Sequence, residues 1–317
     1  MPPIVAIAGP TAAGKSALAL ELCALWPGGA EIVSVDSAQV YRSMDIGTAK
    51  PDAATRARIP HHLIDILDPA QAYSAAAFAR DAAPLVAAIR ARGRLPILVG
   101  GTLLYFKALL DGLSELPAAD TAVRARLERE AGKSGWAALH ARLAQVDPET
   151  AARLHPNDAQ RIQRALEIFE LSGVPASAWF RVERTAPLAG ALCIAVCPAQ
   201  RPELHRRIEQ RLRRMIEQGL VEEVQRLRAR GDLRPDMPSM RAVGYRQLWR
   251  HLDGACTLAQ AVEQAIAATR QYAKRQLTWL GGETRWSRID PTEPNAVSKV
   301  LNLVRQAQAY GDLKASG

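Results

Sequence analysis

Eight residues near the start of the chain have the spacing of a phosphate-binding loop: Gly9, Pro10, Thr11, Ala12, Ala13, Gly14, Lys15 and Ser16. They stand directly after an apolar run and directly before a helical pattern, as such a loop requires. Glycines let the backbone curl until successive N–H groups point inward at an anion. Lys15 adds a mobile positive charge, and the hydroxyl of Ser16 can ligate Mg²⁺. The pattern predicts that the loop binds a pyrophosphate or nucleotide phosphate, and it does not indicate which.

A carboxylate and a hydroxyl follow two other apolar runs. Asp36 comes directly after residues 31–35, and Thr102 follows residues 96–99 and a Gly-Gly pair. If both runs are parallel strands, their carboxyl ends lie at one edge of a sheet, beside the phosphate loop. Asp36 is then placed to ligate Mg²⁺ or to act as a base toward a group bound opposite the phosphates. Either residue can instead cap a helix, because Asp and Thr are favoured at helix N-termini.

Transfer of an ATP phosphate usually needs a carboxylate at the end of a second strand to hold Mg²⁺. The run at 96–99 is followed by Gly-Gly-Thr, with no carboxylate. Two alternatives to group transfer from a pyrophosphate nevertheless stay open. One is a small-molecule or nucleotide kinase that uses the same loop with ATP. The other is a non-catalytic RNA-binding module in which a bound nucleotide acts only as a switch.

The elements that must position these residues alternate between strand and helix in the first third of the chain. Apolar runs at 4–8, 31–35 and 96–99 predict buried strands, and the patterns at 15–25 and 74–92 predict helices between them. Such alternation favours a parallel sheet covered by helices on both faces.

The pattern changes after this point. Residues 113–187 contain no convincing strand and predict helices at 121–131, 135–145, 148–154 and 158–171. Strands are then expected at 191–197 and 285–288, with helices at 202–218, 220–230 and 258–280. The predicted fold class is therefore α/β: a P-loop NTPase-like parallel sheet core at residues 1–112 and 189–317, interrupted by an all-helical insertion domain at residues 113–188.

Composition narrows the class of protein. The chain has 317 residues, 48% of them hydrophobic, and no apolar run approaches the roughly 20 residues that span a bilayer. A net charge of +9 suits phosphorylated substrates or a nucleic-acid partner. The four cysteines lack metal-ligand spacing, so we expect reduced thiols, and the sequence shows no signal peptide. A cytoplasmic protein that does not meet the membrane is expected.

Six segments together carry a family resemblance. With residues 9–16, they are Asp-Ser-Ala-Gln-Val-Tyr-Arg at 36–42, Met-Asp-Ile-Gly-Thr-Ala-Lys-Pro at 44–51, His-His-Leu-Ile-Asp at 61–65, Val-Gly-Gly-Thr at 99–102 and Arg-Ala-Val-Gly-Tyr-Arg at 241–246. In this order they closely resemble tRNA dimethylallyltransferases (tRNA isopentenyltransferases) of the bacterial type, from residue 4 to about residue 281. Departures are small: Ala13 and Ser16 stand where Ser and Thr are common. The zinc-binding extension of some eukaryotic relatives is not expected, so Mg²⁺ is the metal that the resemblance implies.

The resemblance implies a prenyl transfer. The N6 amine of adenosine 37 would attack the allylic carbon of dimethylallyl diphosphate, in tRNAs that read codons beginning with U. Asp36 would accept the proton of this poor nucleophile, and Thr102 would lie near the bridging oxygen. Lys15, the loop amides and Mg²⁺ would stabilise the departing pyrophosphate. Arg207 and Arg211, one turn apart in the predicted helix at 202–218, are candidates for the same task, with a solvated basic helix face as the alternative.

The resemblance also implies contacts with the anticodon stem-loop of tRNA, whose target base must be flipped out of its stack. Composition alone would make each helical segment among them a solvated face. The implied contact residues are Asp36, Ser37, Ala38, Gln39, Thr102, Arg124, Gln160, Arg161, Ile162, Gln163, Arg164, Arg241, Ala242, Val243, Gly244, Tyr245, Arg246, Lys274, Arg275, Gln276, Leu277, Thr278, Trp279, Leu280 and Gly281. Trp136, Trp249 and Trp286 are expected to be packing residues, His61 and His62 to be structural or to line the crevice, and the protein to be a monomer.

Overall fold

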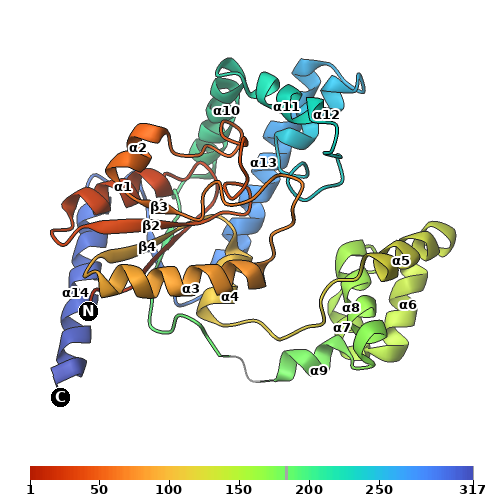
Figure 1. Cartoon of the computed structure of the whole chain (residues 1–317), viewed down its shortest axis with the longest axis horizontal. Coiled ribbons are helices and arrows are strands. Elements are labelled where there is room, and N and C mark those ends of the chain that lie inside the picture. Colours follow the sequence, from red (N-terminus) through yellow and green to blue (C-terminus); the bar gives the residue numbers. More distant parts are fainter. Residues whose placement is uncertain (183–184, 317) are drawn as a thin grey trace. The chain divides into compact units, whose positions relative to one another are not determined.

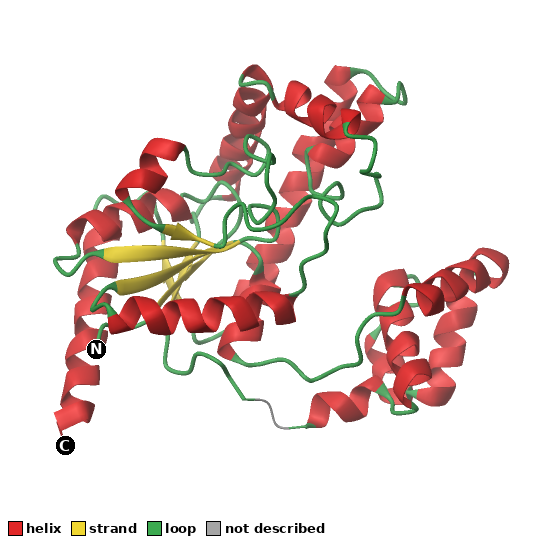
Figure 2. Cartoon of the chain, viewed as in Figure 1, coloured by secondary structure: helices red, strands yellow, loops and turns green. Residues whose placement is uncertain are grey.

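The structure, a computed structural model, describes residues 1–182 and 185–316 (Figure 1). The chain forms two compact units. One consists of Met1–Leu110 and Pro187–Gly317, and the other of Asp111–Ala186. These bounds lie within two residues of those expected from the change of sequence pattern at 113 and 188. In the described residues, all strands belong to the first unit, and the second contains only helices and loops (Figure 2).

The first unit is built on a parallel sheet of six strands. Their order across the sheet is β3-β2-β4-β1-β5-β6, and every pair of neighbours is parallel. Their bounds are β1 Val5–Ala8, β2 Ala30–Val35, β3 His61–His62, β4 Leu95–Gly100, β5 Leu192–Val196 and β6 Ser287–Ile289. All residues of β1, β2 and β4 are buried, because helices cover both faces of a parallel sheet.

The register of the central strands decides where the functional loops begin. Ala8 of β1 pairs with Gly100 of β4, and Gly100 pairs with Val35 of β2. The three strands therefore end at one level. Gly100 is needed at this crossing, because a Cβ there would stand 1.9 Å from the carbonyl oxygen of Val35. The loops that follow β1, β2 and β4 consequently leave the sheet side by side.

Helices next to the sheet make the first core. Helix α1 (Lys15–Leu25) and the last helix α14 (Ala296–Ser316) pack with strand residues into one hydrophobic cluster. Helices α3 (Ala75–Ala91) and α4 (Leu103–Leu110) pack on each other, and α3 also packs on β2 and β4. Ser74 caps α3 by accepting a hydrogen bond from the amide of Ala77, and Asp52 caps the short α2 (Ala53–Arg58) in the same way.

Four further helices of this unit form a second core beside the sheet. They are α10 (Arg201–Glu217), α11 (Leu220–Ala229), α12 (Tyr245–Leu252) and α13 (Leu258–Gly281). Helix α10 is mostly charged, yet Leu204, Ile208, Leu212 and Met215 are buried at spacings of three and four residues. This stripe is the apolar face that a helix needs to pack on its neighbours.

The second unit is a bundle of five helices with its own core. Their bounds are α5 Thr121–Ser134, α6 Trp136–Val146, α7 Pro148–Arg153, α8 Ala159–Ser172 and α9 Ala176–Arg181. A buried carboxylate holds the bundle together: Glu167 accepts hydrogen bonds from the side chains of Arg124 and Arg164 and from the amide of Asp120.

The predicted fold class is confirmed, with several omissions. The predicted set lacks α2, α9 and α12, because six to eight residues offer too little periodicity to recognise. It also lacks α14, which runs from Ala296 to Ser316. Residue 317 lies outside the described part of the chain. Trp249 and Trp286 are buried as expected, and Trp136 packs against the core of the second unit.

Two further findings apply to residues 1–182 and 185–316. None of the helices there is long and apolar enough to cross a membrane. The cysteines Cys23, Cys193, Cys197 and Cys256 are free thiols.

Candidate active site

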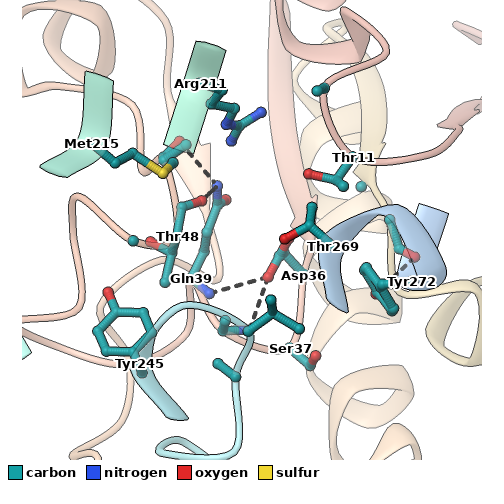
Figure 3. Close-up of a pocket in the computed structure, with 18 of the residues that line it drawn as sticks. Thr11, Asp36, Ser37, Gln39, Thr48, Arg211, Met215, Tyr245, Thr269 and Tyr272 are labelled. Carbon is teal, nitrogen blue, oxygen red and sulfur yellow. Dashed lines mark hydrogen bonds between the residues drawn. The ribbon is translucent and has the colours of Figure 1, made fainter. Parts of the chain in front are cut away.

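A cavity of about 470 Å³ lies at the carboxyl edge of the sheet, within the first unit. The loops after β1, β2 and β4 form its floor, and side chains from α10 and α13 form its walls (Figure 3). Lys15, Asp36, Gly101, Arg211 and Gln276 are among the residues that line it. Three of these, Lys15, Asp36 and Arg211, were singled out by sequence as catalytic candidates. The aligned strand ends bring the loops of Lys15 and Asp36 together, and α10 supplies Arg211.

The phosphate loop has the backbone geometry expected of an anion site. Gly14 adopts a left-handed conformation (φ 97°) at the N-cap of α1, and Ala12 also has positive φ (64°). Gly9 is needed at the start of the loop, because a Cβ there would stand 2.3 Å from the carbonyl oxygen of Val196 on β5. The loop leads into the N-terminus of α1, whose dipole favours a bound anion. Without such a partner, the Lys15 ammonium donates a 2.7 Å hydrogen bond to the carbonyl of Pro10.

Two basic side chains give the cavity its charge. Burial is the main cause that lowers the pKa of Lys15 to about 8, and repulsion from Arg211 lowers it further. Burial likewise lowers the pKa of Arg211, while attraction to Asp36 opposes that change. Within the described part of the chain, no carboxylate forms an ion pair with either group. Two desolvated, unneutralised cations favour a multiply charged anion between them.

Asp36 uses one carboxylate oxygen for structure and exposes the other to the cavity. Its Oδ1 accepts hydrogen bonds from the amides of Ala38 (2.8 Å) and Gln39 (3.3 Å), which fixes the turn after β2. No donor from residues 1–182 or 185–316 reaches Oδ2. The capping role and the chemical role that the sequence left as alternatives are therefore compatible, because each needs a different oxygen.

Thr102 is not among the residues that line the cavity; it ties the loops after β2 and β4 together. Its Oγ1 accepts a hydrogen bond from the amide of Ser37 (3.0 Å) and donates to the Ser37 hydroxyl (3.3 Å). The carbonyl of Thr102 also accepts from Tyr105 in the first turn of α4. Its side chain is thus engaged by Ser37, which itself lines the cavity.

Helix α13 closes the cavity through Gln276 and Tyr272. The buried side chain of Gln276 accepts a 3.0 Å hydrogen bond from the amide of Thr11 and donates a 2.8 Å bond to the carbonyl of Gly101. Tyr272 lies beside it, and burial raises the pKa of its hydroxyl to about 12. The hydroxyl of Tyr272 therefore keeps its proton and donates to Gly101 at 3.4 Å. Arg275 stands 5.8 Å from the centre of the Tyr272 ring, within range of a cation–π contact.

The segment at 44–51 forms a further wall, held by a buried carboxylate that sequence reasoning missed. Glu223 of α11 accepts hydrogen bonds from the amides of Asp45 (2.9 Å), Ile46 (2.8 Å) and Gly47 (3.2 Å). Its fourth partner is the hydroxyl of Tyr245 at 2.5 Å. A local signal could have marked Glu223, because it lies three residues after Leu220 and four before Leu227, on the apolar stripe of α11.

Glu223 and the amides of residues 45–47 that it binds form a clamp, here called the Glu223 clamp. The segment that this clamp holds is connected to Asp36 through Gln39. The carbonyls of Thr48 and Ala49 accept hydrogen bonds from the Gln39 side chain at 3.2 and 3.4 Å. The Gln39 side-chain oxygen in turn accepts from the hydroxyl of Ser34 at 2.8 Å. Because the backbone amide of Gln39 binds Asp36, the position of the carboxylate depends on the segment that Glu223 holds (Figure 3).

Arg207 does not join the cavity, whereas Arg211 does. Arg207 donates a 2.6 Å hydrogen bond to Glu203, one turn earlier on α10, and is absent from the cavity lining. Four residues further along, Arg211 turns its guanidinium toward the site (Figure 3). The structure thus separates the two sequence candidates: the solvated-face alternative describes Arg207, and the pyrophosphate assignment fits Arg211.

The residues implied in RNA binding fall into three groups: those that line the cavity, those exposed or half-buried elsewhere, and those buried or hydrogen-bonded within the protein. Ser37, Ala38, Gln39, Arg241, Ala242, Val243, Tyr245, Arg246, Arg275 and Gln276 line the cavity together with Asp36. Gln160, Arg161, Lys274, Thr278 and Gly281 are exposed elsewhere, while Leu277 and Trp279 are half-buried. The third kind is buried or engaged within the protein: Ile162, Gly244 and Leu280 are buried, and Arg124, Gln163 and Arg164 are hydrogen-bonded within the second unit.

Several of these last residues are engaged inside the second unit. Ile162 has no exposed side chain because it lies on the core face of α8. Arg124 and Arg164 neutralise Glu167, which is itself completely buried. In this structure their cations are used inside the bundle. Arg161, by contrast, leaves 74% of its side chain exposed.

His61 and His62 belong to strand β3 rather than to the cavity. His62 and Arg92 both hydrogen-bond the buried carboxylate of Glu31. The structural alternative is confirmed for this pair. Clusters of three or more His, Cys, Asp or Glu side chains suited to a metal do not occur in the described part of the chain. Among the oxygen-bearing side chains that line the cavity are the hydroxyl of Ser16 and the carboxylate of Asp36, which suit Mg²⁺ when diphosphate and water supply the other ligands.

The chain resembles proteins of known sequence and structure over almost its whole length. A sequence model of the IPP transferase family matches residues 39–283. The tRNA dimethylallyltransferase of Bordetella petrii is 57% identical over 97% of this chain and 98% of its own. That of Halorhodospira halophila is 59% identical over 89% of this chain and 91% of its own.

The chain is also similar to solved structures of prenyltransferases that act on tRNA. The tRNA isopentenylpyrophosphate transferase of Bacillus halodurans is 37% identical, with a TM-score of 0.72, and the alignment covers 99% of this chain and 100% of that one. A eukaryotic dimethylallyltransferase, crystallised while acting on tRNA, is 26% identical with a TM-score of 0.79, over 94% of this chain and 77% of that one.

Proposed function

This chain belongs to the IPP transferase family, and we propose that it transfers a dimethylallyl group from dimethylallyl diphosphate to tRNA. The acceptor is N6 of adenosine 37 in tRNAs that read codons beginning with U. The products are N6-(dimethylallyl)adenosine and diphosphate. The arrangement that supports this reaction is a nest for an anion, with Lys15 and Arg211, in the same cavity as the Asp36 carboxylate.

The diphosphate is held before it leaves. Inward amides of residues 9–16 and the ammonium of Lys15 bind its oxygens, after Lys15 releases the carbonyl of Pro10. Arg211 contributes a second cation from α10. As the allylic C–O bond breaks, its electron pair passes to the diphosphate oxygen. These fixed cations then stabilise more charge in the transition state than in the ground state.

The adenine amine is activated on the opposite side. Its nitrogen forms a bond to the allylic carbon of the donor and loses a proton. Asp36 Oδ2 is placed to accept that proton, while Oδ1 stays fixed by Ala38 and Gln39. Carboxylate orientation matters here, because an amine attached to an aromatic ring is a weak nucleophile.

Mg²⁺ is part of this proposal. The hydroxyl of Ser16 would ligate it at the cavity, and it would neutralise charge on the diphosphate. We also propose that the protein acts as a monomer on the anticodon stem-loop, in the cytoplasm. Four free cysteines support the last point, because the cytoplasm keeps thiols reduced.

The decisive experiment is incubation of the purified protein with dimethylallyl diphosphate, Mg²⁺ and unmodified tRNA. Nucleosides from the digested tRNA are then weighed by mass spectrometry. We expect one adenosine at position 37 to gain the five-carbon group and diphosphate to be released in equal amount. Unchanged nucleosides would reject the proposal. Incubation with ATP and no prenyl donor provides the comparison for the kinase alternative, which requires a phosphorylated product.

A further inference from the structure

A second hollow of about 460 Å³ adjoins the candidate active site. Three residues line both spaces: Ala49, Arg211 and Met215. The wall between the two spaces is therefore one side chain deep at these positions. On its far side, Ile46 and Pro51 supply apolar surface among charged residues.

Helix α10 presents two kinds of surface to the active-site cavity. Arg211 supplies a cation, and Ile208, Leu212 and Met215 supply apolar side chains around it. A prenyl diphosphate has the same two parts, a charged head and a hydrocarbon tail. If Arg211 meets the head, the tail that starts at the neighbouring carbon falls on this apolar face.

Met215 is the part of the shared wall that can limit this tail. The side chain of Ala49 is a single methyl group, and the guanidinium of Arg211 is directed to the diphosphate. Met215 is 9% exposed and extends from α10 toward the segment that contains Thr48 (Figure 3). An unbranched thioether fills irregular space well, so it can close the apolar end of a cavity around a short tail.

We propose that Met215 determines the length of the prenyl chain that the site accepts, by separating the tail pocket from the neighbouring hollow. This inference rests on the function proposed above. A five-carbon tail fits on the near side of the wall. A ten-carbon geranyl tail needs the space that Met215 fills and the hollow beyond it, where Ile46 and Pro51 would contact the added carbons.

The test compares kcat/KM for geranyl diphosphate and dimethylallyl diphosphate, with tRNA as acceptor. Met215→Ala removes three heavy atoms from the wall. A difference of one methylene in an apolar pocket typically changes discrimination about 10–200-fold. We expect the geranyl-to-dimethylallyl ratio to rise by about tenfold or more. Met215→Val, a milder truncation that disturbs packing less, should shift the ratio in the same direction.

Two controls locate the effect. Ile208→Ala shortens an apolar side chain that lines the active-site cavity but not the hollow. It removes a contact with the first five carbons, which both donors share, so it should lower kcat/KM for both and leave their ratio near that of the wild type. Met215→Leu keeps the volume of the wall and should also preserve the ratio. Thermal unfolding of each variant confirms that the folded protein is being assayed.

The outcomes separate the two proposals. Dimethylallyl transfer by the wild type tests the proposed function alone, and its absence rejects that function. With that transfer present, a raised ratio in Met215→Ala or Met215→Val but not in Ile208→Ala supports the role of Met215. An unchanged ratio in the folded truncations, or an equal rise in Ile208→Ala, overturns it.

Discussion

The side-chain oxygen of Gln276 accepts a 3.0 Å hydrogen bond from the backbone amide of Thr11, across 265 residues of sequence. The side-chain nitrogen of Gln276 also donates a hydrogen bond to the carbonyl of Gly101, so this one side chain fixes the loops after β1 and β4 relative to each other. The loop at residues 9–16 and the loop that begins at Gly101 therefore depend on one buried contact.

Replacing Gln276 should disturb diphosphate binding. Gln276→Glu keeps an acceptor for Thr11 but loses the donor to Gly101 and adds a negative charge beside the phosphate loop. We expect the Kd for dimethylallyl diphosphate, measured by calorimetry, to rise about tenfold or more. Gln264→Glu, an exposed glutamine on the same helix, is the control. Equal affinity of the wild type and Gln276→Glu would contradict the bridging role.

Asp36→Asn should separate structure from chemistry. An amide oxygen can still accept from Ala38 and Gln39, so the turn and the melting temperature should change little. The amide cannot accept the amine proton, so kcat for transfer should fall about 10²–10⁴-fold. Binding of tRNA, followed by gel shift, should persist. A variant with near-normal turnover would reject Asp36 as the base.

The pKa of Lys15 predicts a pH-dependent affinity. Burial lowers it to about 8 in the empty site, so above that pH the ligand must bind together with a proton. The Kd for dimethylallyl diphosphate should rise about tenfold per pH unit between pH 8 and 10. Lys15→Met should bind more weakly at pH 7 and lose most of that slope. An equally steep slope in Lys15→Met would assign it to another group.

The lowered pKa of Lys15 also makes the free energy of unfolding of the ligand-free protein depend on pH. Below pH 8, Lys15 is charged in the folded and unfolded chain, so the burial cost is fully present. As pH rises from 8 toward the ordinary value of 10.5, the folded lysine loses its proton first and this cost disappears. Lys15→Met should therefore be more stable than the wild type at pH 7, by about 1–3 kcal/mol, and the difference should shrink at pH 10. Urea unfolding at both pH values measures it.

Gly47 should not tolerate a side chain. A Cβ there would lie 2.5 Å from the buried ring of Tyr245. Gly47→Ala should lower the free energy of unfolding by about 1–3 kcal/mol and reduce transfer, because the Glu223 clamp must shift. The matched control is Gly132→Ala on α5, where nothing lies within 4 Å of the added methyl. This second change should be neutral or stabilising by about 0.5–1 kcal/mol.

Two arginines one turn apart on α8 should respond differently to truncation. Arg161→Ala removes an exposed cation, which should weaken tRNA binding and reduce the slope of log Kd against log salt by about one. Arg164→Ala removes a partner of the buried Glu167 and should destabilise the helical unit by about 3 kcal/mol. Salt-dependent binding and chemical unfolding distinguish these effects. A stability loss in Arg161→Ala, with unchanged binding, would reverse the assignment.

The local sequence pattern was sufficient to predict the phosphate loop and the two strands that precede Asp36 and Thr102. Their residues are close in sequence, and alternating strands and helices require the carboxyl ends of parallel strands to meet at one edge. Likewise, the helical insertion could be located from a change of periodicity. Short helices such as α9 and α12 were missed, because their formation depends on packing more than on a repeat of their own.

Tertiary structure alone decided which side chains complete the site. Glu223 contacts Asp45 across 178 residues; its place on the apolar stripe of α11 indicates burial, but not which distant segment it holds. Arg207 and Arg211 have the same residue type and neighbouring turns, yet Glu203 binds the first and the cavity receives the second. Met215 became a candidate for specificity only when two cavities were found to share it. Such choices depend on how helices rotate and pack on one another, and that is fixed by contacts between segments far apart in the chain.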